Sequence, residues 1–545
     1  MKKIYFFTLI FSINLLQSQN TVGTITITED VNDAFTLFTV HTKSYLINNC
    51  GEVINQWDSN YPPGNAVYLL ENGNLLRAGR LNDGSSNITF PGTGGIVELF
   101  DWDGNVLWSY TYSSNDFRQH HDVYPMPNGN VLILAATLMS QSEAIQAGRN
   151  PNLLQDGELY NEQIIEVEPI GTNQANIVWE WNIKDHLIQD FDSTKDNFGN
   201  VSENQQLLDI NYTNNGSGSN NWLHLNSIQY NQARDQIIIS SRNLSEIWII
   251  DHSTSTSEAA TSSGGIYNKG GDFLYRWGNP EVYRQGTLND RKLFGQHTPY
   301  FIEPGLPNED KIIIFNNGNG RTPNFSQIDI ISPPETSFGV YDYAPNTAYE
   351  PTNPDYTYSD LSSDPSEFFS GIVSSAQQLD NGNILICEGR EGHFFEINSN
   401  GEKVWEYINP ISSNNGTSTS QGDSAPADNL TFRAFKYNMD YPGFIGRDLT
   451  PGPTLELNPD LTSCNSLSIS NFEESIVKVF PNPSKNKIEI NAKIPIDKID
   501  IYNALGRRMN EIKSSKIDLS EYAEGIYYLK IYSGSRIINK KVIKN

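Results

Sequence analysis

Histidine is the residue type in this 545-residue sequence with the clearest capacity for chemistry, and only eight copies are present. Three of them stand in similar positions ahead of a hairpin, namely His121, His224 and His297. His121 and His224 each precede an asparagine of the hairpin by seven residues, and Ser374 holds the corresponding place in the segment after His297. A neutral imidazole is a competent nucleophile, base or metal ligand near pH 7. The shared spacing predicts that these side chains converge on one site.

A guanidinium and an amide accompany the histidines. Arg242 follows His224 across its hairpin, and Asn226 lies two residues after His224, on the same side of an extended strand. Imidazole, amide and guanidinium donors together suit an anion with several oxygens, such as sulfate or phosphate. Three histidines could also bind a metal, but the one nearby carboxylate, Asp122, alternates away from His121. The sequence has no Gly-x-Ser-x-Gly elbow and no phosphate-binding glycine loop, so we expect an anion site with no metal and no cofactor.

A repeated pattern indicates which elements position these residues. An apolar strand, an Asn-Gly turn and a second apolar strand form the strongest short hairpin signal, because both turn residues need a positive φ. This pattern occurs at 67–76, 122–133 and 378–386, with degenerate copies at 227–240 and 300–315. A third strand and a fourth strand that ends near a tryptophan follow each hairpin. Four-stranded sheets repeated around an axis form a β-propeller.

We count five such units and expect a sixth to be assembled from strands at 35–57 and 432–437. The predicted fold class is therefore all-β: a six-bladed β-propeller over 21–456, followed by a small C-terminal β-sandwich. The first strand of a blade starts beside the central channel, so histidines at its start should face one axial site. Polar insertions at 202–221, 253–265 and 412–428 account for the length beyond six simple blades.

Charge and targeting signals limit the partners of the protein. The net charge of −27 argues against a nucleic-acid or anionic-membrane partner, because both need a basic face. The three cysteines exclude a disulfide framework and include no pair at metal-ligand spacing. Residues 1–19 have the basic start, short apolar run and polar exit of a signal peptide, and that run is too short to span a bilayer. We expect an exported protein, secreted or at the cell surface, with no stable membrane insertion.

The C-terminal segment is a separate unit by charge and pattern. Residues 476–545 contain fourteen Lys or Arg and seven Asp or Glu, a net of +7, and short alternating strands separated by turns, as in a small antiparallel sandwich. A linker is expected at 457–475. The motifs at 479–483, 501–506 and 525–529 resemble the C-terminal sorting domain of the type IX secretion system. This resemblance implies the type IX secretion machinery as a partner, with passage across an outer membrane and then release or surface attachment.

The propeller region resembles the bacterial arylsulfate sulfotransferase family, which uses no nucleotide sulfate donor. The motifs that support this are His120-His121-Asp122, Trp222-Leu223-His224-Leu225-Asn226, Ser240-Ser241-Arg242-Asn243, Gly295-Gln296-His297, Asn381-Gly382-Asn383 with Glu396, and Phe432-Arg433-Ala434 with Gly446-Arg447-Asp448. The family is a six-bladed propeller that moves a sulfuryl group from a phenolic sulfate ester to a phenol through a sulfohistidine. A non-catalytic surface-binding propeller and a sulfate ester hydrolase with the same site are the alternatives.

The resemblance implies roles for individual residues. His297 matches the nucleophile, and the residues that match the sulfate-binding groups are His224, Asn226 and Arg242. Either His120 or His121 matches a third histidine; the spacing favours His121, and a shift of one residue would select His120. Ser374 or Ser375 could add an oxygen ligand. The aromatic residues expected beside the histidines to hold an aryl ring are Trp222, Tyr300 and Phe301.

Overall fold

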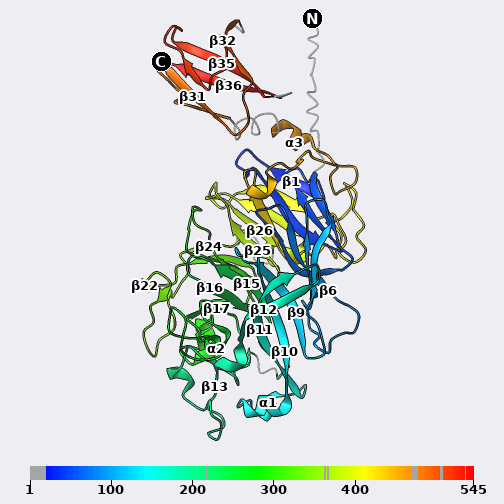
Figure 1. The fold of residues 1–545 in the computed structure, drawn as a ribbon, viewed down its shortest axis with the longest axis vertical. Helices are drawn as coiled ribbons and strands as arrows, with labels where there is room; N and C mark the ends of the chain where they lie inside the picture. The colour runs from blue at the N-terminus through cyan, green and yellow to red at the C-terminus, as the bar shows by residue number, and fades with distance from the viewer. Residues whose placement is uncertain are drawn as a thin grey trace, which may run out of the picture. The chain divides into compact units, whose positions relative to one another are not determined.

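The computed structural model is all-β, as the sequence predicts, and describes residues 20–214, 218–360, 364, 367–467, 477–503, 507–533 and 536–545 (Figure 1). The expected signal peptide at 1–19 lies outside the described residues, as does the end of the expected linker, 468–475. Clustering of Cα positions divides the chain into two compact units, and the smaller consists of Ile27–Asp33 and Leu461–Asn545.

The larger unit contains six antiparallel sheets of four or five strands, as predicted for the blades. One strand of each sheet contacts a strand of the next sheet, and these contacts close a ring. Three sheets form from strands that are consecutive in the chain. The first contains β5 (Pro63–Leu69), β6 (Leu75–Arg80), β7 (Gly95–Phe100) and β8 (Val106–Thr111), and the second contains β9 (Phe117–Pro125), β10 (Val131–Ser140), β11 (Glu158–Ile170) and β12 (Gln174–Asn182). The third contains β15 (Leu225–Asn231), β16 (Gln236–Ser241), β17 (Glu246–Asp251) and β18 (Tyr275–Trp277). The fourth joins β19 (His297–Phe301), β20 (Ile312–Asn316), β21 (Gln327–Ile331) and β24 (Tyr356–Tyr358).

The two remaining sheets of this unit bring distant parts of the chain together. One has the composition expected for the closing blade, with β29 (Ala434–Asn438) beside β2 (Ala34–Val40), β3 (Lys43–Ile47) and β4 (Val53–Asp58). The other, β25 (Ser375–Gln378), β26 (Ile384–Glu388), β27 (His393–Ile397) and β28 (Lys403–Ile408), gains a fifth strand, β1 (Gly23–Ile27), that the sequence did not predict. Strands β5, β9, β15, β19, β25 and β29 follow one another in contact, and β2 contacts β5. This arrangement is that of a β-propeller.

The tryptophan that ends the fourth strand has a structural role that explains its recurrence. In five sheets its indole N–H donates a hydrogen bond to an oxygen of the next sheet, at 2.7–3.1 Å: Trp57 to Asp101, Trp108 to Gln174, Trp179 to Thr254, Trp277 to Pro351, and Trp405 to Asn49. The last of these bonds connects the end of the propeller to its beginning. Each indole therefore buries a large apolar surface and satisfies its only donor across a blade boundary.

Short elements occupy the connections. The helix α1 (Gln141–Gln146) begins at a capping box formed by Ser140 and Glu143, and α2 (Thr256–Ala259) begins at another. The other short elements are α3 (Thr462–Leu467), the parallel pair β13 (Leu187–Ile188) and β14 (Leu208–Asp209), and the hairpin of β22 (Glu335–Ser337) and β23 (Val340–Tyr341). No helix within the described residues is long and apolar enough to cross a membrane.

The C-terminal unit has its own core between two small antiparallel sheets. One sheet contains β30 (Val477–Phe480), β31 (Lys487–Ala492) and β34 (Lys516–Asp518), and the other contains β33 (Arg508–Ile512), β32 (Lys498–Asn503), β35 (Gly525–Ser533) and β36 (Arg536–Lys544). Alternate residues of β31 and β35, such as Ile488 and Ile490, are buried, which is the pattern of a strand with one solvated face. Cys387, in β26 of the larger unit, is a buried thiol.

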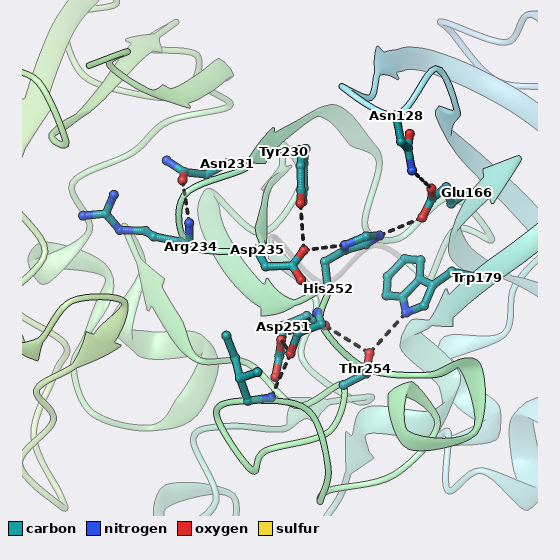
Figure 2. A network of polar contacts seen from close by, with 12 residues as sticks. Asn128, Glu166, Trp179, Tyr230, Asn231, Arg234, Asp235, Asp251, His252 and Thr254 are labelled. Carbon is teal, nitrogen blue, oxygen red and sulfur yellow. Dashed lines mark hydrogen bonds and ion pairs between the residues drawn. The ribbon is translucent and has the colours of Figure 1, made fainter. Parts of the chain in front are cut away.

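A buried histidine connects the two blades that carry His121 and His224. Figure 2 shows His252 between Glu166 of β11 and Asp235, with its ring nitrogens 2.9 and 2.7 Å from the two carboxylates. Burial lowers the pKa of His252, but its hydrogen bonds to Asp235 and Glu166 outweigh burial and raise that pKa to about 9. Asn128, from the hairpin turn of the repeated pattern, also donates to Glu166. His252 is therefore a cation that holds neighbouring blades together.

This arrangement predicts a pH-dependent stability. The pKa of His252 rises on folding from 6.5 to about 9, so its contribution is fully present below pH 6.5 and is lost as the pH rises through 9. The free energy involved is on the order of 3 kcal/mol. We expect His252→Gln to lower the melting temperature strongly at pH 6 and far less at pH 10. His41→Gln, at the turn between β2 and β3, is the control, and equal losses at both pH values for His252→Gln would contradict the prediction.

Candidate functional site

The first strands of four successive blades share an unusual backbone conformation where the site forms. The φ angle is positive at His121 (49°), His224 (49°), Thr298 (50°) and Ser374 (94°), all at or just before the start of the inner strand or within its irregularity. Non-glycine residues seldom adopt this region, and such irregularities re-aim side chains near functional sites. His121, His224 and Ser374, which the sequence places at equal spacing before their turns, therefore share a strained backbone conformation. His297 lies one residue before Thr298, the strained residue of its own blade.

Two of the predicted histidines meet face to edge in an aromatic setting. The rings of His121 and His224 are 4.7 Å apart between centroids, and Phe90 lies 6.2 and 5.8 Å from them. Phe432, from the segment before β29, lies 6.3 Å from His121 and also 6.3 Å from His297. The three histidines therefore surround one region flanked by two phenylalanines.

Hydrogen bonds fix the tautomer of His297. Its Nδ1 lies 2.8 Å from Oδ1 of Asn317, whose amide nitrogen donates to the carbonyls of Ser370 and Val373. The amide of Val373 donates to Nε2 of His297 at 3.2 Å. Because Asn317 Oδ1 can only accept and the Val373 amide can only donate, Nδ1 bears the proton and Nε2 carries the lone pair.

The electrostatics keep these imidazoles neutral. Burial, followed by the charge of Arg242, lowers the pKa of His297 to about 3. Burial also holds the pKa of His121 and that of His224 well below 6.5, with His224 and Arg242 respectively as the next causes. At pH 7 all three rings are unprotonated, and a neutral imidazole is the nucleophilic form.

The two arginines near the site differ in their partners. Arg242, half-buried after β16, makes no ion pair with a described carboxylate, and it donates from Nη1 to Oδ1 of Asn243 at 3.3 Å. Arg433 is ion-paired to Asp122 at 2.7 Å and donates to the hydroxyl of Tyr68. Arg242 thus has its charge available for an anion, while Arg433 is largely neutralised by Asp122.

His120, the alternative to His121, lies between a buried carboxylate and His121. Its Nε2 is 2.8 Å from Glu162 of β11, and its Nδ1 is 3.0 Å from Nδ1 of His121. Both side chains of the His120–Glu162 pair are buried. His121 therefore faces the site, and His120 lies behind it.

The predicted amide and hydroxyl ligands are already hydrogen-bonded within the fold. Asn226 donates one N–H of Nδ2 to the carbonyl of Gln296 at 2.8 Å. Ser374 donates to Ser370 or Ile372 and accepts from Gly389, and Ser375 donates to Ala434. These three residues position the inner strands around the site.

Several neighbours of the site had no signal in the sequence. Asn317, Glu162 and Phe90 lie in different blades or in the connections between them. Phe432 belongs to a motif of the family resemblance, but no role in the site was expected for it. The expected aromatic residues are engaged elsewhere: Trp222 donates to the carbonyl of Tyr160 beneath Arg149, and Phe301 packs under Arg234. Within the described residues, no group of three or more His, Cys, Asp or Glu side chains is arranged to hold a metal ion.

The fold and the site together define a β-propeller with histidines at the start of its inner strands and, after the second strand of one blade, an arginine that forms no ion pair with a described carboxylate. The family model for arylsulfotransferase (ASST) matches residues 38–433, most of the chain, and the protein belongs to that family. A secretion system C-terminal sorting domain matches residues 478–545. The resemblance recognised in the sequence is confirmed for both regions. No curated protein matches the chain.

Solved structures with a similar course of the chain are distant in sequence. A protein of unknown function from Bacteroides caccae is 10% identical, with 74% of this chain and 98% of that chain covered and a TM-score of 0.38. A catalytically inactive virginiamycin B lyase from Staphylococcus aureus, solved with quinupristin, is 10% identical, with 72% and 90% covered and a TM-score of 0.32. The β-propeller domain of Cps50 (Swd1) from Myceliophteria thermophila is 10% identical, with 65% and 88% covered and a TM-score of 0.31.

Proposed function

We propose that this protein transfers a sulfuryl group from a phenolic sulfate ester to a phenol through a sulfohistidine at His297. The observation that carries the proposal is the fixed tautomer of His297, whose buried Nε2 holds a lone pair while Nδ1–H is bound by Asn317. A serine hydroxyl would need a separate base to reach the same state, whereas Nε2 of this imidazole already carries no proton. Its 3.2 Å hydrogen bond from the Val373 amide is given up when Nε2 attacks sulfur.

The two half-reactions use the same groups in opposite order. Nε2 of His297 attacks the sulfur, the bond between sulfur and the aryl oxygen breaks, and the phenol leaves. Arg242 and His224 stabilise the negative charge on the sulfuryl oxygens, the kind of electrostatic contribution that is typically worth ~3–4 kcal/mol for each donor lost. A second phenol then attacks the sulfur of the sulfohistidine and restores His297. Asn226, Ser374 and Ser375 hold the inner strands in place.

The protein context is that of an exported enzyme. A type IX sorting domain indicates a secreted or cell-surface protein that engages the secretion machinery. Small-molecule substrates are in keeping with the arylsulfotransferase family.

One assay separates this proposal from its alternatives. With 4-nitrophenyl sulfate and phenol, we expect release of 4-nitrophenol together with an equal amount of phenyl sulfate, and much slower release when phenol is omitted. A hydrolase with the same intermediate would release 4-nitrophenol and free sulfate at the same rate without phenol. No release in either case would favour a non-catalytic binding propeller. Thin-layer or liquid chromatography of both sulfated products provides the measurement.

A further inference from the structure

Behind His121 lies a continuous chain of hydrogen-bonding groups that the sulfuryl transfer described above does not use. Glu162 Oε2 is 2.8 Å from His120 Nε2, and His120 Nδ1 is 3.0 Å from His121 Nδ1. His120 is 0% exposed and Glu162 is 1% exposed. The second carboxylate oxygen accepts the amide N–H of Leu225 at 3.0 Å, so both oxygens of Glu162 are held in place.

The charge of Glu162 has one partner among the described residues. His120 is the only basic side chain within ion-pair distance of it. Both groups are buried, and the carboxylate faces Nε2 of His120. In the arrangement on which the relay below is built, His120 donates Nε2–H to Glu162 and Nδ1–H to His121, which leaves the proton of His121 on Nε2.

Gly92 lies against the face of the His121 ring and does not block the in-plane direction of Nε2. A Cβ on Gly92 would lie 2.0 Å from Nε2, 2.2 Å from Cε1 and 2.6 Å from Cδ2 of His121. Similar distances to three adjacent ring atoms place Gly92 over the face of the imidazole, not in line with Nε2. The ring of His224 lies 4.7 Å from that of His121, so the two histidines border the same region.

We propose that Glu162 and His120 form a proton relay that makes His121 the acid of the first half-reaction and the base of the second. The inference rests on the proposed function. Burial keeps the pKa of His121 well below 6.5, so His121 cannot act as an acid by holding a second proton itself. The relay removes that requirement, because His121 gives one proton from Nε2 as it takes another at Nδ1.

The proton balance of the relay is complete. As the S–O bond to the donor breaks and the bond from sulfur to Nε2 of His297 forms, the aryl oxygen takes the Nε2 proton of His121. His121 Nδ1 takes the Nδ1 proton of His120, which becomes neutral and keeps its Nε2–H on Glu162. The proton that left with the first phenol is replaced by that of the second phenol, which gives it to His121 Nε2 as its oxygen attacks sulfur. His121 then returns a proton from Nδ1 to His120.

The test is a series of aryl sulfate donors whose phenols differ in acidity, run on the full-length protein. Glu162→Gln keeps an oxygen for the Leu225 amide but cannot stabilise an imidazolium at His120. With phenyl sulfate, where the leaving oxygen needs a proton, we expect kcat/KM for the first half-reaction to fall at least ~100-fold, the lower range of general-acid catalysis. With 4-nitrophenyl sulfate, whose phenolate leaves readily, we expect a loss of about 3-fold or less. His120→Gln should reproduce this pattern.

The controls separate a relay from a structural role. Glu98→Gln makes the same substitution at a buried, ion-paired glutamate in β7 and should affect all donors equally. An equal loss across the donor series in Glu162→Gln and His120→Gln would overturn the relay. The wild-type protein alone supplies a further test: a steep dependence of its rate on the acidity of the leaving phenol would also overturn the relay. If the wild type transfers no sulfuryl group to any phenol, it is the proposed function that fails.

Discussion

The His297→Ala protein should fold as the wild type does and transfer no sulfuryl group. The substitution removes the only atom proposed to bond to sulfur, and loss of a nucleophile in other enzymes lowers kcat by up to about 10⁶-fold. We expect a loss of at least ~10⁴-fold in release of 4-nitrophenol. The melting temperature should change little, because His297 makes its side-chain bonds only to Asn317 and to the amide of Val373.

A mass measurement identifies the nucleophile directly. Wild-type protein given donor alone should gain the mass of one sulfuryl group on the peptide that contains His297, and His297→Ala should gain none. His41→Ala, at the turn between β2 and β3, is the matched control and should retain full activity. A label on the peptide of His224 or of His121 would assign the nucleophile to that residue. Full activity of His297→Ala would remove the sulfotransferase mechanism and favour a binding propeller.

Arg242→Ala should lower kcat/KM by about 10²- to 10³-fold, the usual cost of losing one donor to a developing charge. Arg242 has no described carboxylate partner, so its charge is free to meet the sulfuryl oxygens, and its removal leaves no buried acid unpaired. Arg242→Lys keeps the charge but lacks the planar fork, and we expect it to be at least ~10-fold slower, about 1.4 kcal/mol.

Kinetics with 4-nitrophenyl sulfate and a thermal melt of each variant measure these effects. Arg390→Ala is the control, because Arg390 is a largely exposed arginine near Glu391. A wild-type rate in Arg242→Lys would mean that charge alone suffices. A wild-type rate in Arg242→Ala would show that the anion is bound elsewhere.

Local sequence patterns were sufficient for the strands and their order. The Asn-Gly hairpins became pairs such as β5–β6, β9–β10 and β25–β26. The expected positive φ at both turn residues was wrong: φ is positive at Gly73, Gly129 and Gly382 but not at the asparagine before each, which is the pattern of a longer loop that ends in a left-handed glycine. The tryptophans were correctly associated with fourth strands, although their hydrogen bonds to the next sheet were not foreseen. The fifth strand, β1, gave no signal, because a strand that joins a sheet from the far end of the chain has no local partner.

Residue type and spacing were also sufficient to predict which histidines share a position in the fold. The spacing of His121, His224 and Ser374 before their turns predicted a shared position, and the structure shows it as a shared positive φ. Spacing also favoured His121 over His120. The orientation of Asn226 was not predictable from alternation, because the irregularity at the start of β15 breaks the period of two.

Only the tertiary structure decided what each imidazole can do. The proton on Nδ1 of His297 depends on Asn317, twenty residues further on, and the environment of His121 depends on Glu162 and Phe90 from other strands and loops. Tautomer, pKa and access are set by burial and by partners brought together when six sheets close into a ring. Those partners lie far apart in the chain, so no local pattern encodes them.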